Sequence, residues 1–224
     1  MEGAAAGVPD QTAAVAAPGP YTPGRRPAGV LVPVYDGPRG ATLLLIRRTA
    51  GGLHGGQVAF PGGRPEPGDA TLLGTALREA YEEVGIEPAA VEVVGVLPVV
   101  ETLTSNFAIF AYVGRLPERP RLRLQASEVA AVLDVPLADL LAPGLPVEEV
   151  WEFSRGRDQA LAPAAGGRRT AGARPEGAAG ESGAVRRPVR YFPWGEDKIW
   201  GATARIVEHL LAALRTGTLR LSGS

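Results

Sequence analysis

The sequence predicts an α/β protein formed by a single domain of the 224-residue chain. Four apolar runs rich in β-branched residues have the length and composition of strands: residues 28–35, 41–48, 91–99 and 107–116. Two other segments repeat apolar residues at three- and four-residue steps, as amphipathic helices do: residues 69–85 and 199–214. A chain of this length is long enough to bury a substantial core between such elements.

The composition excludes several kinds of site and partner. There are no cysteines, which excludes disulfides, thiolate metal sites and cysteine nucleophiles, and two histidines are too few for a multi-histidine zinc site. The formal net charge of −1 provides no basic field for nucleic acid. No apolar run approaches the ~18 residues that a membrane span needs. We therefore expect a soluble, cytoplasmic protein with no nucleic-acid or membrane partner.

The first 26 residues are mostly Ala, Gly, Pro and Val without periodicity, so residues 1–26 are predicted to be a disordered tail rather than a signal peptide. The domain then opens with a hairpin, because the turn-forming segment 36–40 joins the first two apolar runs. Pro33 lies inside the first run and has no backbone donor, which predicts an edge strand or a bulge. Residues 217–224 are expected to be a C-terminal tail.

The segment 69–85 carries the start and stop signals of a helix. Asp69 is the predicted N-cap, with Thr71 close behind it, and Gly85 stands where the helix would end. One face has an apolar stripe, and the opposite face places three carboxylates on about one turn: Glu79, Glu82 and Glu83.

This acidic turn has two interpretations. Like charges at these spacings cost a helix only about 0.2–0.5 kcal/mol per pair, so a solvated acidic face is the simpler one. However, the Gly-rich turn Pro61-Gly62-Gly63 leads towards the acidic turn, and Arg78 lies beside it. Hard divalent cations take clustered carboxylate oxygens, and Mg²⁺ commonly combines a few carboxylates with the phosphates of its substrate. The flanking pattern therefore favours a metal site.

The stretch from Gly63 to Ile86 resembles the Nudix box, G-x5-E-x7-R-E-U-x-E-E-x-G-U, in which U is a bulky apolar residue. Here Gly63 is followed after five residues by Asp69 and, after eight more, by the run REAYEEVGI that begins at Arg78. The Asp in place of Glu, the extra residue before Arg78 and the small Ala80 depart from the box. All three departures match the coenzyme A diphosphatases, a Nudix subfamily whose box reads FPGG, then Asp, then ALREAxEE.

The stretch before the box is similar to a second signature of the same subfamily, approximately LLTxRSxxLRxHxGxVxFPGG. An ungapped alignment keeps these positions: Leu43, Leu44, Arg47, His54, Gly56, Val58, Phe60, Pro61, Gly62 and Gly63. Gly52 stands where the subfamily has a second Arg, which concerns coenzyme A specificity more than catalysis.

The resemblance implies substrate contacts in this stretch. Arg47 or Arg48 would meet a substrate phosphate, since a guanidinium suits that planar, bidentate contact, or both would form a polar strand end. His54 would orient the substrate or cap the loop, and Gly62 and Gly63 would line the substrate site in the turn.

Residues 127–141 resemble a common Nudix arrangement of Glu-Val, a strand ending in VPL and a short helix. Glu128 would then be a further metal ligand or base, or else a solvent-facing loop residue. Glu101, in the link before the strand at 107–116, has the same two interpretations. The sequence here differs from the pattern of the Nudix subfamily, in which a Gly near Asn106 and a Pro near Ala111 are usual.

The C-terminal part begins with a biased segment. Residues 155–188 are rich in Gly, Ala, Arg and Pro without an apolar period, which predicts a disordered insertion. Its seven arginines against three acidic residues would contact anionic substrates or belong to a passive loop. Residues 189–192 would return as a strand. The run IWGATA at the start of the last helix again resembles the subfamily, and the apolar face of that helix predicts core packing.

Together the resemblances imply the Nudix α/β/α sandwich, with a mixed central β-sheet and one catalytic domain over residues 27–216. They also imply hydrolysis of a nucleoside diphosphate derivative with Mg²⁺ or Mn²⁺ as cofactor. The implied principal metal ligands are Glu79 and Glu83, with Glu82 as a further ligand or base.

The other implied roles concern the support of the site and its substrate. Arg78 would orient Glu79 and pair with Asp69, which holds the Gly62-Gly63 turn against the helix. The subfamily implies coenzyme A or its thioesters as substrates, cleaved to 3′,5′-ADP and 4′-phosphopantetheine. An ADP-ribose or dinucleotide hydrolase remains an alternative, as does a Nudix domain that binds a nucleotide for regulation without cleaving it. Nudix dimers are common, which favours a homodimer.

Overall fold

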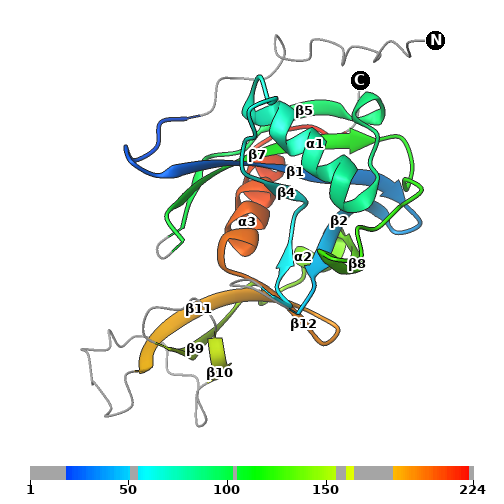
Figure 1. The fold of residues 1–224 in the computed structure, drawn as a ribbon. Helices are drawn as coiled ribbons and strands as arrows, with labels where there is room; N and C mark the ends of the chain where they lie inside the picture. The colour runs from blue at the N-terminus through cyan, green and yellow to red at the C-terminus, as the bar shows by residue number, and fades with distance from the viewer. Residues whose placement is uncertain (1–18, 51–54, 103–104, 155–159, 164–183, 222–224) are drawn as a thin grey trace, which may run out of the picture.

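The computed structural model describes residues 19–50, 55–102, 105–154, 160–163 and 184–221 (Figure 1). Its main sheet is mixed, in the order β3-β2-β1-β7-β5, with β8 on β2 and the short strands β4 and β6 on β1 and β7. The strands are β1 (Arg26–Gly37), β2 (Gly40–Arg48), β3 (Val58–Ala59), β4 (Gly62–Gly63), β5 (Glu92–Val96), β6 (Val100–Glu101), β7 (Phe107–Leu116) and β8 (Val129–Pro136). The predicted hairpin is confirmed, because Gly37 pairs with Gly40 in antiparallel β1 and β2.

The prediction for Pro33 was wrong, because β1 is a central strand without a register shift. On one side it runs parallel to β7, with Pro33 opposite Gly114. On the other side it pairs with β2 from Val34 onwards and with β4 only at residues 29–30, so Pro33 falls between the two paired stretches. The backbone N–H of Leu31 donates to the carbonyl of Pro61 on that same side. Residues two apart in a strand point their backbone nitrogens to the same side, so the nitrogen of Pro33 also faces this gap between the paired stretches. The absence of an N–H on Pro33 therefore costs no hydrogen bond of the sheet.

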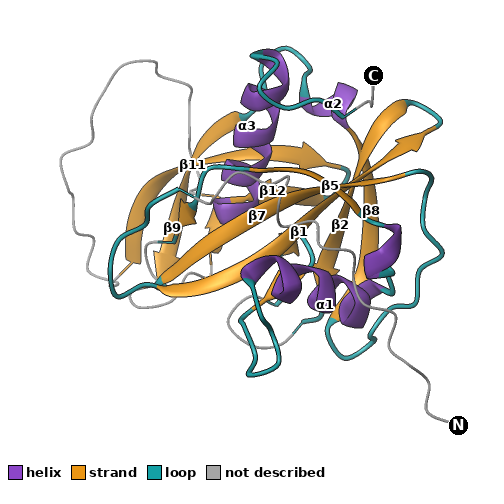
Figure 2. Cartoon of the chain, turned by 90° about the horizontal axis from the view of Figure 1, so that it is seen from above, coloured by secondary structure: helices purple, strands orange, loops and turns teal. Residues whose placement is uncertain are grey.

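Two helices cover opposite faces of this sheet (Figure 2). Helix α1 (Leu72–Val84) packs on the face that carries Leu31 and Leu44, and helix α3 (Gly201–Arg215) packs on the face that carries Val32 and Leu43. Neighbouring residues of one strand thus enter different cores, as strand alternation requires. The α/β/α sandwich with a mixed central sheet is confirmed. Helix α2 (Leu137–Leu140) follows β8, as expected, and a 3₁₀ turn, η2 (Pro88–Ala90), precedes β5.

A second sheet, which the sequence did not predict, has the order β10-β9-β11-β12 and lies beside the sandwich (Figure 1). Its strands are β9 (Val147–Ser154), β10 (Ala160–Pro163), β11 (Ala184–Trp194) and β12 (Asp197–Trp200). The expected return of a strand at 189–192 is confirmed within β11. The predicted insertion at 155–188 was wrong for residues 160–163 and 184–188, which belong to strands; its other residues lie outside the described part of the chain.

The predicted terminal tails, residues 1–26 and 217–224, were also too long. Tyr21 packs edge-on against Phe110 with 5.3 Å between ring centroids, and the Thr22 backbone N–H donates to Glu101 Oε1 at 2.6 Å. At the other end, Leu219 is buried in the core beneath α3. Tertiary contacts thus extend the domain beyond both expected limits. No helix in the described ranges is long and apolar enough to cross a membrane.

Candidate active site

Helix α1 begins and ends on identifiable caps. Thr71, not Asp69, is the N-cap: its Oγ1 accepts the N–H of Gly74 at 3.0 Å. At the other end Gly85 adopts φ 78°, a left-handed conformation that suits Gly, and donates to Tyr81 O at 2.9 Å. The predicted C-terminus is confirmed, whereas Asp69 lies before the helix because its carboxylate is used elsewhere.

Asp69 and Arg78 form the pair that ties the loop to the helix. Arg78 Nε lies 3.0 Å from Asp69 Oδ1, and Arg78 Nη2 lies 3.0 Å from Oδ2, a bidentate contact. Thr75 Oγ1 and the backbone N–H of Glu66 also donate to Asp69, at 3.0 and 2.9 Å. The Arg78 guanidinium, followed by these donors, lowers the pKa of Asp69 to about 2. The expected pairing is thus present.

Arg78 also reaches the acidic turn and the Gly-rich turn. Its Nη2 lies 3.2 Å from Glu79 Oε1, and its Nη1 donates to Glu82 Oε2 at 2.8 Å. The same Nη2 donates to the backbone carbonyl of Arg64, the residue after Gly63, at 3.2 Å. One guanidinium therefore fixes the loop, the turn and two carboxylates relative to each other, as expected for a residue that positions Glu79.

The Asp69→Asn variant should be less stable than the wild-type chain by about 1.5–3 kcal/mol at pH 7, since it loses charge-assisted hydrogen bonds. The pKa of Asp69 is lowered on folding, so the carboxylate stabilises the fold above its unfolded value of about 4 and this contribution disappears as the pH falls towards 2. Urea unfolding of both chains from pH 7 to pH 2.5 checks this. The stability difference should shrink with acidification, and Asp36→Asn, at an exposed position near the end of β1, is the control. A constant difference across that range would contradict the assignment.

Glu83 is the buried member of the acidic turn, with its side chain 2% exposed. Its Oε2 accepts the Gly62 N–H at 3.0 Å, and its Oε1 lies 3.3 Å from Arg48 Nη1. Burial raises the pKa of Glu83 to about 7, against the opposing effects of Arg48 and the Gly62 amide. Burial also raises the pKa of Glu79, where Arg78 opposes it. Two carboxylates are thus held where their charge is poorly solvated.

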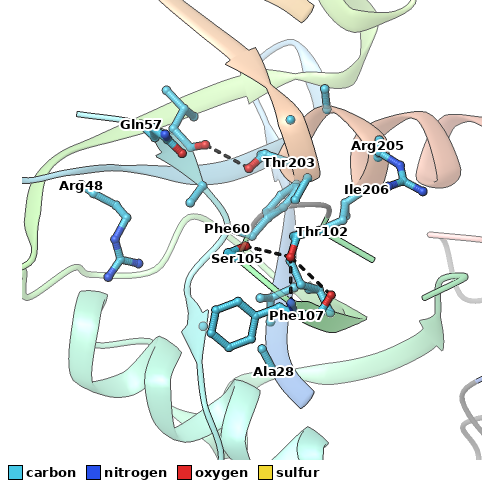
Figure 3. Close-up of a pocket in the computed structure, with 18 of the residues that line it drawn as sticks. Ala28, Arg48, Gln57, Phe60, Thr102, Ser105, Phe107, Thr203, Arg205 and Ile206 are labelled. Atoms are coloured by element: carbon cyan, nitrogen blue, oxygen red, sulfur yellow. Dashed lines mark hydrogen bonds between the residues drawn. The ribbon is translucent and has the colours of Figure 1, made fainter. Parts of the chain in front are cut away.

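A cavity of about 1020 Å³ lies above this turn. Its carboxylate wall consists of Glu79, Glu82, Glu83 and Glu128, the last from the loop before β8. Gly62, Gly63 and Arg48 also line the cavity, and Figure 3 shows Arg48 extending from β2 towards α1. The structure therefore brings Glu128, Arg48 and the two glycines to the same cavity as the acidic turn.

One sequence-predicted substrate residue, Arg47, is not brought to the cavity. Arg47 does not line it; instead Arg47 Nε and Nη2 lie 2.9 and 2.5 Å from the two carboxylate oxygens of Asp197 in β12. Successive residues of β2 face opposite sides, so only one of the two arginines can point at α1. His54 and Gly52 lie outside the described residues.

The donor set suits a hard divalent cation. The carboxylate wall offers only oxygen ligands, which Mg²⁺ and Mn²⁺ prefer, and the poorly solvated charges of Glu79 and Glu83 favour a cation beside them. Within the described ranges no three acidic or histidine side chains already stand as one compact metal group. Arg48 and Arg78 hold oxygens of Glu83, Glu79 and Glu82, so binding an ion would exchange arginine contacts for metal contacts.

The opposite side of the cavity was missed by sequence reasoning. It comprises Phe153 of β9, Arg187 and Arg190 of β11, Trp200, and the first turns of α3. In that helix Thr203 Oγ1 donates to Val58 O at 3.0 Å (Figure 3). The arginine-rich composition of residues 155–188 was the only signal in the sequence. It could not be placed, because the second sheet that carries Arg187 was not recognised.

Comparisons with known proteins agree with this geometry. The family model of the NUDIX domain matches residues 25–155, more than half of the chain. Nudix hydrolases NudL of Klebsiella pneumoniae and of Salmonella newport are each 47% identical over 120 residues, which is 54% of this chain and 62% of theirs. The match thus spans less than two thirds of the length of these relatives, which are described as uncharacterized.

The solved structures are less similar in sequence to this chain than the NudL relatives are. A Nudix hydrolase from M. smegmatis, RenU, is 23% identical with a TM-score of 0.43, covering 54% of this chain and 78% of its own. The NUDIX domain of Shewanella oneidensis NrtR, solved with ADP ribose, is 22% identical with a TM-score of 0.44, covering 54% and 81%. The assignment rests instead on the match of the NUDIX domain and on the box residues gathered at one cavity. The chain belongs to the Nudix family.

Proposed function

We propose that this chain is a metal-dependent hydrolase that cleaves the pyrophosphate bond of a nucleoside diphosphate derivative, with coenzyme A or its thioesters as the substrate. The products would be 3′,5′-ADP and 4′-phosphopantetheine. The observation that carries the proposal is the cavity in which all three box glutamates, Glu128 and the Gly62-Gly63 turn meet. No box acid has been lost, which favours a hydrolase over a regulatory nucleotide-binding domain.

Each group in the cavity has a chemical task in this reaction. Glu79 and Glu83 would hold Mg²⁺ or Mn²⁺, which supplies charge neutralisation of the pyrophosphate and a lowered pKa of bound water. Glu82 or Glu128 would accept the proton of the attacking water, because both line the cavity and neither is buried. Arg48 would contact a phosphate oxygen in place of its long contact to Glu83.

The choice of coenzyme A rests on the second signature and on the space available. Residues 43–63 keep most of that signature, including the FPGG run whose two glycines line the cavity. The volume of 1020 Å³ lies at the upper end of the roughly 300–1,000 Å³ typical of pockets for drug-sized ligands. A substrate larger than a mononucleotide therefore has room.

A substrate panel tests the proposal directly. The purified chain is incubated with coenzyme A, an acyl-coenzyme A, ADP-ribose, NADH and diadenosine polyphosphates, each with Mg²⁺, Mn²⁺ or EDTA. We expect release of 3′,5′-ADP from coenzyme A with either metal and none above the uncatalysed rate with EDTA, because the divalent ion would supply both the charge neutralisation of the pyrophosphate and the lowered pKa of the attacking water.

The other outcomes separate the alternatives. Cleavage of ADP-ribose or a dinucleotide but not of coenzyme A would replace the substrate and keep the metal chemistry; Gly52 and the departures at Asn106 and Ala111 favour this second candidate. Tight nucleotide binding without turnover of any compound would favour a regulatory domain. Turnover that is insensitive to EDTA would contradict the metal assignment.

A further inference from the structure

The cavity has two halves of opposite charge. Its lining from residues up to 155, where the NUDIX match ends, contains six glutamates and three arginines. Its lining from later residues contains three arginines, Arg187, Arg190 and Arg205, and one glutamate, Glu208. The first half attracts a cation, whereas the second attracts an anionic group that is separate from the pyrophosphate.

The three arginines differ in how much of their charge is already neutralised. Arg190 Nη1 lies 3.0 Å from Glu208 Oε1, so that pair carries little net charge. Arg205 Nη1 donates to the backbone carbonyl of Glu101 at 2.8 Å, and its side chain is exposed. Arg187 contacts no carboxylate among the described residues. Its half-buried guanidinium instead lies 5.3 Å from the centre of the Phe153 ring.

Strand register explains this placement of Arg187. In the antiparallel pair of β9 and β11, Arg187 stands opposite Trp151 and Val185 stands opposite Phe153, so these side chains share one face. Trp200 packs on the same aromatic group, 5.3 Å from Trp151 and 6.1 Å from Phe153 between ring centroids. Phe153, Arg187 and Trp200 all line the cavity. An oriented guanidinium thus stands beside an aromatic group of which Phe153 and Trp200 line the cavity.

We propose that Arg187, supported by Phe153 and Trp200, binds a phosphomonoester on the ribose of the nucleotide half of the substrate. This inference rests on the proposed function and assigns its specificity to the part of the cavity beyond the NUDIX match. A guanidinium suits bidentate contact with a phosphate, and aromatic side chains provide a surface for a base. Coenzyme A carries such a phosphate on its 3′ carbon in addition to the pyrophosphate, whereas ADP-ribose does not.

Equilibrium binding tests the site without any need for turnover. Calorimetry in EDTA compares 3′,5′-ADP with 5′-ADP, which has the same number of phosphates but none on the ribose 3′ carbon, and with 5′-AMP. We expect the wild-type chain to bind 3′,5′-ADP about ten- to a hundredfold more tightly than 5′-ADP, the effect of charge-assisted hydrogen bonds. Arg187→Gln should remove this preference and leave the affinity for 5′-AMP unchanged.

Arg186→Gln is the matched control. Arg186 is the preceding residue on the opposite face of β11, its Nε donates to Glu152 Oε1 at 2.7 Å, and it does not line the cavity. This variant should keep the preference for 3′,5′-ADP. Thermal unfolding of both variants checks that neither substitution disturbs the second sheet.

Turnover separates this inference from the proposed function. If coenzyme A is cleaved, the ratio of kcat/KM for coenzyme A over dephospho-coenzyme A should fall about tenfold or more in Arg187→Gln and stay unchanged in Arg186→Gln. If coenzyme A is not cleaved but Arg187 still governs the preference for 3′,5′-ADP, the proposed function fails and the phosphate site stands. No wild-type preference, or an equal loss of affinity for 3′,5′-ADP and 5′-AMP in Arg187→Gln, would overturn the site.

Discussion

Glu83→Gln is expected to reduce kcat/KM at least about a hundredfold while the metal-free fold becomes no less stable. Loss of groups that merely support a metal ligand costs up to about a hundredfold, so loss of a ligand itself should reach that figure. Gln keeps the shape of the side chain and an oxygen to accept the Gly62 N–H, but it cannot provide a carboxylate for the ion. Steady-state kinetics with a Mg²⁺ titration measures the loss.

Glu83 is expected to support activity but to lower the stability of the metal-free fold. Burial raises its pKa from the usual value near 4.5 to about 7, so the folded state binds the proton more tightly than the unfolded state between those values. Ionised Glu83 therefore destabilises the metal-free fold. This destabilisation is complete above pH 7 and absent below about pH 4.5. Urea unfolding in EDTA should show Glu83→Gln as stable as the wild-type chain, or more stable, at pH 8, and the difference should vanish towards pH 4.5.

Glu87→Gln is the control, because Glu87 is an exposed glutamate just after α1 that does not line the cavity. Its kinetics and its pH dependence of stability should match those of the wild-type chain. Full metal-dependent turnover in Glu83→Gln would show that Glu83 is not a metal ligand. A large loss of stability at pH 8 would instead show that the contact with Arg48 outweighs the cost of burying the charge.

Local sequence patterns predicted those elements whose partners are near in the chain or whose periodicity is strong. The hairpin of β1 and β2, the acidic helix and the strand at Phe107–Leu116 agree with expectation. Each is specified by alternation, by a 3.6-residue period or by turn residues, which act within a few residues. The N-cap shows the limit of that information: Asp69 has the right chemistry for a cap, but its bond to Arg78 left Thr71 to cap the helix.

The second sheet shows a different limit. β9 pairs with β11 across the biased segment, with Tyr191 opposite Val147, and the first half of β11 contains two consecutive arginines and a Pro, which resemble loop sequence. Long-range pairing of this kind leaves no local periodicity to read. For the site, the box glutamates were found because they lie on one helical turn. The arginines of the opposite wall come from strands and a helix whose proximity only the fold reveals.

Arg47 and Arg48 show how one residue changes an assignment. Both were candidates for phosphate contact, and the resemblance matched Arg47, rather than Arg48, to the arginine of the signature. In β2 the pleat sends Arg48 to Glu83 and Arg47 to Asp197. A shift of one position along a strand exchanges the two faces, so the choice depends on register, which is set by the pairing of β2 with β8 and β3.

The two glycines before α1 should respond to substitution in different ways. In Gly62→Ala the new Cβ would meet backbone atoms, 2.5 Å from Gly29 O and 2.6 Å from Val30 Cα, at a φ of 154° that other residues rarely adopt. These atoms belong to β1 and cannot move without breaking the pairing of β4 with β1. Strain and overpacking together should cost about 2–4 kcal/mol of unfolding free energy.

Gly63→Ala should instead keep most of the stability and lose activity. Its new Cβ would lie 2.6 Å from Glu79 Cδ, the far end of a flexible side chain, which can rotate away at a cost of about 1 kcal/mol or less. The displaced carboxylate would no longer face the cavity where the ion is expected. Misplacement of a reacting group by about 1 Å can cost about a hundredfold, so we expect a loss of kcat/KM between about tenfold and a hundredfold.

Urea unfolding and steady-state kinetics on the same preparations distinguish the two effects. Gly68→Ala is the control in the same loop, because a Cβ there has no atom within 4 Å, and it should match the wild-type chain in both measurements. If Gly63→Ala lost stability as Gly62→Ala does, the Glu79 side chain would be held too firmly to yield. If Gly63→Ala kept full turnover, the position of the Glu79 carboxylate beside Gly63 would not be the one that matters for catalysis.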